Sequence, residues 1–139
     1  MIAPALAMLL APLPADPPVL GPIGRQALPA KGCAAFLWDA QPSRRLVAMA
    51  TAEPAQLRLH LDGRTVDVAR AGQGGSAGFG FAGLTEYRGG DVVAVLDIGV
   101  ETRRDLQGGG VVPAGTLRVE RPGRDVLVTP VAGLIGCAS

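Results

Sequence analysis

The sequence contains few of the residues that usually form metal or catalytic sites. Its 139 residues include one histidine, His60, and two cysteines, Cys33 and Cys137. Zinc sites in proteins take three or four His, Cys or carboxylate ligands, and this set falls short of one. A D-x-[DN]-x-[DN]-G calcium loop is also absent from the sequence. We therefore expect no metal site and no cofactor.

Aromatic residues are scarce as well, at 4% of the chain. Hydrophobic residues nevertheless make up 48% of it, which argues against a disordered chain. The core must therefore be assembled from Val, Leu, Ala and Ile. Its few large side chains are those of Phe36, Trp38, Phe79, Phe81 and Tyr87.

No block of charge of one sign occurs. Thirteen basic residues against twelve acidic ones give a formal net charge of +1, and the two signs are interspersed along the chain. Nucleic acids and anionic membranes attract clustered basic residues. The sequence therefore gives no sign of a nucleic-acid or anionic-membrane partner.

The beginning of the chain resembles an export signal. The first 24 residues carry one charged side chain, Asp16, and start with the apolar run 2–13. Signal peptides have an apolar stretch of this kind followed by small residues, so 13–15 (Leu-Pro-Ala) is a candidate cleavage region. The basic n-region is missing. Either the true start lies upstream, or this is an apolar, Pro-rich leader of another kind.

A membrane-spanning helix is not expected here, because a span needs about 20 apolar residues and prolines interrupt this run. Residues 16–31 hold four prolines and two glycines, and they read as a Pro-rich linker without regular structure. We divide the chain into a signal-peptide-like leader (1–15), this linker (16–31) and an all-β domain (32–139). A bacterial, extracytoplasmic protein, periplasmic or secreted, is the expectation.

The two cysteines stand near the start and the end of the expected domain. In an exported chain they form one disulfide that joins the first and last strands, Cys33 to Cys137. The alternative is a pair of unrelated buried thiols. A redox-active pair is not expected, because the spacing is not Cys-x-x-Cys.

The run Asp91–Val100 is the most apolar stretch of the expected domain, and it predicts a central strand. Val92, Ala94, Leu96, Ile98 and Val100 would line one face. The opposite face carries Val93 and Val95, so we expect cover on both sides.

The clearest local pattern spans residues 56–69. Apolar and polar residues alternate on both sides of Asp62-Gly63, a favoured two-residue hairpin turn. Placing Leu61 opposite Arg64 pairs Leu59 with Val66 and Leu57 with Val68 on one face. The same register pairs Arg58 with Asp67 and His60 with Thr65 on the other face.

Other short alternating runs bring the total to seven to nine strands, separated by turn residues and without an amphipathic helix. The Gly-rich stretch 71–83 reads as a flexible loop with Phe79 and Phe81 on one side. This pattern predicts an all-β fold. A small antiparallel sandwich is the first choice and a small β-barrel is the alternative.

One stretch matches the residue spacing of a catalytic motif. Gly74-Gly75-Ser76-Ala77-Gly78 matches the G-x-S-x-G nucleophile elbow of hydrolases. That elbow requires a helix after the serine and a histidine later in the chain, whereas His60 precedes Ser76. Such a match is expected by chance in a Gly-rich stretch, and no catalytic residue is assigned.

Four residues are weak candidates for a ligand site. Asp97 is a carboxylate in an apolar strand, where burial would require hydrogen-bond donors or a shifted pKa. Arg88 and Arg103 flank the same strand. His60 can titrate near neutral pH, although the hairpin register places it on the outer face.

These observations favour a non-catalytic, exported binding or assembly module with an unknown protein or small-molecule partner. The alternatives are a small hydrolase centred on Ser76 with His60, and a structural subunit that pairs through edge strands.

Overall fold

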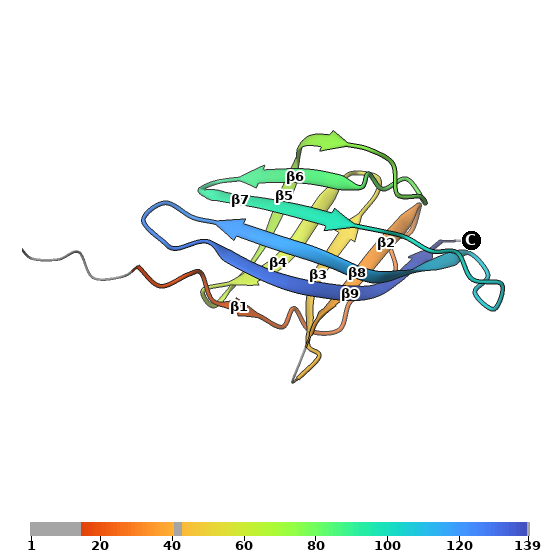
Figure 1. Cartoon of the computed structure of the whole chain (residues 1–139), viewed down its shortest axis with the longest axis horizontal. Helices are drawn as coiled ribbons and strands as arrows, with labels where there is room; N and C mark the ends of the chain where they lie inside the picture. Colours follow the sequence, from red (N-terminus) through yellow and green to blue (C-terminus); the bar gives the residue numbers. More distant parts are fainter. Residues whose placement is uncertain (1–14, 41–42, 139) are drawn as a thin grey trace, which may run out of the picture.

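The computed structural model describes residues 15–40 and 43–138, so all of the proposed leader (1–15) except Ala15 lies outside the described residues. Every regular element in these residues is a strand (Figure 1). The nine strands are β1 (Leu20–Gly21), β2 (Cys33–Asp39), β3 (Leu46–Thr51), β4 (Gln56–Leu61), β5 (Arg64–Gly74), β6 (Leu84–Gly89), β7 (Val92–Ile98), β8 (Gly109–Glu120) and β9 (Leu127–Cys137).

Strands β2 to β9 form a closed antiparallel barrel in which each strand pairs with its neighbours in sequence. The barrel closes where β2 pairs with β9, from Cys33 opposite Cys137 to Asp39 opposite Val131. A disulfide joins these two cysteines. The all-β fold and the disulfide are thus confirmed. Of the two architectures weighed, the barrel is observed, because the first and last strands hydrogen-bond to each other.

The barrel nevertheless keeps two layers, because β5 changes partners along its length and β9 pairs with a second strand over only part of its length. The first half of β5 pairs with β4, and the half after Ala69 pairs with β6. Likewise β9 pairs with β2 only from Val131 onward, while its first residues pair with β8 alone. In Figure 1, β6 to β9 run along the long axis in front and β3 and β4 run across it behind. The first-choice sandwich shares this layering but lacks the closing ladder.

The predicted hairpin is confirmed pair by pair. Leu61 lies opposite Arg64, Leu59 opposite Val66 and Leu57 opposite Val68. The turn residues Asp62 and Gly63 have φ values of 50° and 84°, which two-residue hairpin turns of this kind require. On the outer face, Arg58 and Asp67 form an ion pair at 2.8 Å.

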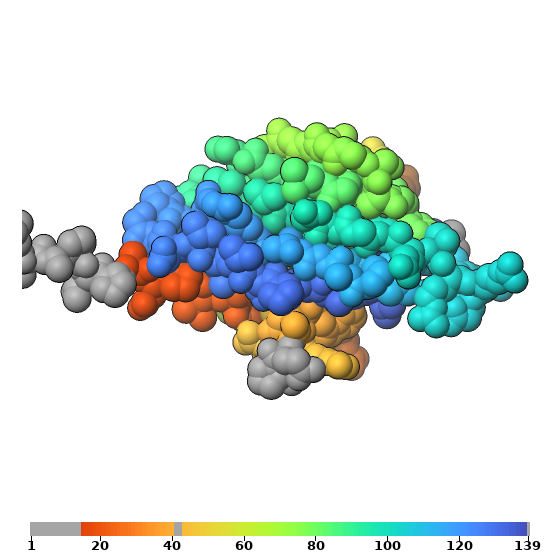
Figure 2. All heavy atoms as spheres, viewed as in Figure 1, coloured from red at the N-terminus to blue at the C-terminus, as the bar shows by residue number. Residues whose placement is uncertain are grey.

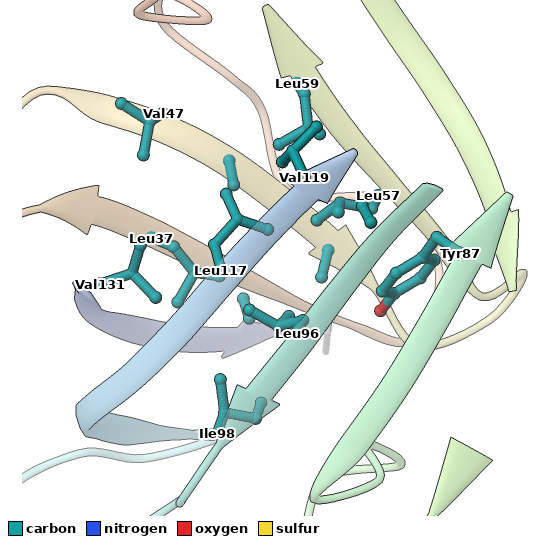
Figure 3. Close-up of a cluster of buried hydrophobic side chains, with 14 of the residues drawn as sticks. Leu37, Val47, Leu57, Leu59, Tyr87, Leu96, Ile98, Leu117, Val119 and Val131 are labelled. Atoms are coloured by element: carbon teal, nitrogen blue, oxygen red, sulfur yellow. The ribbon is translucent and has the colours of Figure 1, made fainter. Parts of the chain in front are cut away.

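Inward-facing side chains of all eight barrel strands form the core. Figure 3 shows Leu residues of β2, β4, β7 and β8 meeting across the interior. In β7, Val92, Ala94, Leu96 and Ile98 are buried as expected. The opposite face of this strand is the outer wall, where Val93 and Val95 are half-buried and Asp97 is exposed. The expectation of cover on both sides of β7 was therefore wrong.

Residues 16–31 differ from the expected linker, and we call them the strap. β1 lies within the strap and pairs with the end of β4, at Leu61 and His60. Further along, the Ile23 amide donates to the Leu46 carbonyl (2.9 Å). In Figure 2 the start of the strap, in red, packs beside the blue β8–β9 hairpin. The strap escaped prediction because contacts with distant strands, rather than its own sequence pattern, hold it.

Candidate functional site

In the described part of the chain, closely packed apolar side chains occupy the barrel interior. Leu37, Leu57, Leu59, Leu96 and Leu117 are all at most 2% exposed. The one large polar side chain among them is that of Tyr87, and burial raises the pKa of its hydroxyl. Binding surfaces must therefore be sought on the outer wall and at the two ends of the barrel.

An open groove of about 720 Å³ lies on the outer wall across β2, β9 and β8. We call it the Trp38 groove. Its apolar lining includes Trp38, Val111, Pro113, Ala132 and Leu134, and its rim includes Asp39 and Arg44.

Strand register explains why these side chains meet. Trp38 of β2 lies opposite Ala132 of β9, and Leu134 lies opposite Val111 of β8, so all four project from one face of the sheet. The pairing of β8 and β9 is irregular between Val112 and Gly115, at the position of Pro113. Bulges of this kind turn side chains outward beside functional surfaces.

Close packing of β2 against β9 supports the floor of the groove. A Cβ atom at Gly133 would overlap the carbonyl oxygen of Phe36, so only glycine fits at this point. The rim is held by an ion pair between Asp39 and Arg45 at 3.0 Å. The shape of the groove is therefore fixed by the packing of three strands and by the ion pair at its rim.

A second group of polar residues lies at the end of the barrel that carries the β4–β5, β6–β7 and β8–β9 turns. We call this the hairpin end. Arg121 contacts Asp62 at 2.8 Å and Asp91 at 2.9 Å, and Arg124 contacts Asp62 at 3.2 Å. These four residues, which we call the hairpin-end cluster, join three turns that are far apart in sequence.

Hydrogen bonds shift the pKa values of this cluster. The Val19 amide, followed by Arg121 and Arg124, lowers the pKa of the Asp62 carboxyl. Arg121 in turn lowers the pKa of Asp91. Both carboxylates are thus held in the charged form, which suits a structural role better than proton transfer.

The opposite end carries the β3–β4, β5–β6 and β7–β8 connections, and we call it the loop end. Here the Gly-rich connection folds over the barrel and places Phe81 in the core, 7% exposed. A Cβ atom at Gly110 would lie 2.6 Å from the Phe79 ring, so β8 passes directly beneath it. The two phenylalanines act as a lid, and the stretch expected to be a flexible loop makes these specific contacts.

The four candidate residues are not gathered into one site. His60 lies on β4 near the hairpin end, where its ring bonds to Thr65 (3.2 Å) and β1 covers it at Gly21. Arg88 of β6 is exposed and pairs with Glu86 at 3.1 Å. Asp97 is exposed near the loop end of β7, opposite Leu84. Arg103 lies in the β7–β8 connection and pairs with Asp105 at 3.3 Å.

Ser76 and His60, the alternative catalytic pair, lie at opposite ends of the barrel. Ser76 is exposed in the connection between β5 and β6, at the loop end. His60 is one residue from the last position of β4, beside the hairpin end. The fold does not bring them within hydrogen-bonding distance.

Sequence reasoning missed both the Trp38 groove and the hairpin-end cluster. Each is assembled from strands or turns that are distant in sequence. The only usable signals were the single tryptophan, Trp38, and the two arginines of the Arg121–Arg124 turn.

Within 15–40 and 43–138, the acidic, His and Cys side chains form no group of three suited to a metal ion. The same residues contain no helix that could span a bilayer. Comparison of the chain with protein-family models, curated proteins and solved structures gives no match.

Proposed function

We propose that this chain is an exported, non-catalytic module that binds another protein through the Trp38 groove. The observation that carries the proposal is the groove itself, an open apolar surface built around the only tryptophan of the chain. Exposed apolar patches with a hollow are typical of binding surfaces, and tryptophan is enriched among residues that dominate binding energy.

The shape and rim of the groove favour a protein over a small molecule. Small ligands bind in enclosed cavities that cover most of their surface, whereas this groove is open along three strands. The rim carries an acid and a base, Asp39 and Arg44. The expected partner therefore presents an apolar ridge flanked by charges of both signs.

Export is supported by the disulfide between Cys33 and Cys137. Such bonds persist in oxidising compartments and are rare in reducing ones. A binding role agrees with the separation of Ser76 from His60 and with the local ion pairs that engage Arg88 and Arg103.

A matched pair of substitutions tests the groove. Leu134 and Leu84 are exposed by 48% and 47%, both on strands, but only Leu134 lines the groove. Proteins retained from a periplasmic extract by the wild-type chain are purified and titrated against it, with the fluorescence of the single tryptophan as the signal. Burial of the indole by a partner is expected to shift its emission to shorter wavelength.

Leu134→Asp is expected to weaken this binding by at least about tenfold, equivalent to about 1.4 kcal/mol. Leu84→Asp should leave it unchanged, and both variants should keep the wild-type Tm. The proposal fails if no retained protein gives a saturable shift, or if the two variants bind equally well.

A further inference from the structure

The first residues of the strap are fixed by the hairpin-end cluster. Arg124 donates from Nε to the carbonyl oxygen of Asp16 (2.8 Å) and from Nη2 to that of Pro17 (2.9 Å). Asp62 accepts the amide proton of Val19 (2.9 Å). Backbone groups of Asp16, Pro17 and Val19 are thus bound by side chains from two distant turns.

Burial changes abruptly at the same place. Ala15, Asp16 and Pro17 are exposed, whereas Pro18 is among the fully buried side chains. β1 follows two residues later and pairs with β4. Within the described residues, contacts with the barrel therefore start at Asp16, upstream of the domain boundary at residue 32 expected from the sequence.

The bond before Asp16 also has the local sequence of a processing site. A small residue, Ala15, precedes it and the apolar run 2–13 lies upstream, while Leu13 takes the position of the first small residue of an A-x-A site. Signal peptidases cleave after small residues that follow an apolar stretch. The exposed Ala15 leaves the bond accessible, while cleavage beyond Pro18 would remove a buried side chain from the barrel.

We propose that a signal peptidase hydrolyses the Ala15–Asp16 peptide bond, and that Arg124 and Asp62 form the receptor for the new N-terminal segment. In this step water supplies a hydroxyl to the Ala15 carbonyl carbon and a proton to the Asp16 nitrogen. The C–N bond breaks, and the new carboxyl group of Ala15 passes its proton to the Asp16 amine, which leaves a carboxylate on Ala15 and an ammonium group on Asp16. The proposal rests on the exported character proposed above, and it adds the position of the mature N-terminus.

The first test incubates the full chain with a purified signal peptidase in detergent micelles and follows the intact mass. The expected product has the mass of residues 16–139. Ala15→Arg places a large charged residue before the bond and should abolish this product. Ala30→Arg makes the same change at an exposed strap residue and should leave the rate unchanged. Absence of cleavage, cleavage at another bond, or equal rates for Ala15→Arg and wild type would overturn the proposal.

The second test examines the receptor by digesting the folded chain with a non-specific protease. The wild-type chain is expected to resist trimming from Asp16 onward, whereas Arg124→Ala should be trimmed into the strap. Arg118→Ala is the control, because its ion pair is with its neighbour Glu120. If Arg124→Ala resists trimming like the wild type, the receptor role is wrong.

Both tests are independent of any binding partner. A chain that is cleaved at Asp16 but gives no saturable fluorescence shift refutes the groove and keeps the processing site. A chain that gives a saturable fluorescence shift but is not cleaved at Asp16 refutes the processing site and leaves the binding role of the groove supported.

Discussion

The two ends of the barrel are closed by different forces. At the loop end, Phe79 and Phe81 cover the opening, and the disulfide joins Cys33 to Cys137 nearby. At the hairpin end, Asp62, Asp91 and two arginines link three turns and the strap. One closure is apolar and covalent, and the other is ionic and in contact with solvent.

The difference predicts where stability resides. Burial of an aromatic ring contributes several kcal/mol and does not depend on salt, whereas exposed ion pairs contribute about 0–1 kcal/mol and are screened by salt. We therefore expect the loop end to dominate the free energy of unfolding. The hairpin end should instead set how the protein responds to pH and ionic strength.

The largest effect is expected at the lid. Phe81→Ala should lower the free energy of unfolding by about 3–5 kcal/mol, because it leaves a cavity among buried side chains. Phe79→Ala should cost less, since Phe79 is only partly buried. Urea denaturation measures both, and neither loss should change with added salt. A loss below about 1 kcal/mol for Phe81→Ala would mean that the lid does not seal the core.

Loss of the disulfide is expected to have the next largest effect on the free energy of unfolding. Replacing both Cys33 and Cys137 by Ser should lower stability by about 2–5 kcal/mol, because the bond closes a long loop in the unfolded chain. The cysteines are 104 residues apart. The β2–β9 ladder should keep the barrel closed, so the far-UV circular dichroism spectrum should not change. A reductant should lower the Tm of the wild type and leave that of the double variant unaffected. If the reductant lowered the Tm of the wild type and of the double variant equally, the disulfide would not be the source of this stability.

The sequence was sufficient to predict structure that depends on neighbouring residues. The hairpin of β4 and β5 was predicted in full register, because strict alternation and the Asp62-Gly63 turn specify the same pairing. The pairing of Cys33 with Cys137 could be inferred because the chain offers no other cysteine.

Features built from distant segments could not be predicted. Sandwich and barrel differ in which distant strands pair, and no local pattern indicates that β2 pairs with β9. The strap has no periodicity, and side chains such as Arg124, more than a hundred positions away, hold it. The Trp38 groove depends on three strands and on the irregular pairing around Pro113.

The smallest expected effect sharpens the contrast between the ends. Asp62→Asn removes one charge from the hairpin-end cluster but suits the turn, because Asn tolerates the positive φ found there. The Asn side-chain oxygen can still accept the Val19 amide. The loss at neutral pH should therefore be at most about 1 kcal/mol, as for exposed ion pairs, and should shrink as salt is added.

The pH dependence of this difference gives the decisive measurement. The pKa of Asp62 is lowered in the folded state, first by the Val19 amide and then by the two arginines. Its carboxylate therefore stabilises the fold fully above the ordinary carboxyl pKa of about 3.9, and this contribution is lost as the pH falls through the lowered value. The Tm difference between wild type and Asp62→Asn should be constant near neutral pH and vanish in acid. A difference that persists in acid or in high salt would mean that Asp62 acts through turn geometry, and the ionic closure of the hairpin end would then be wrong.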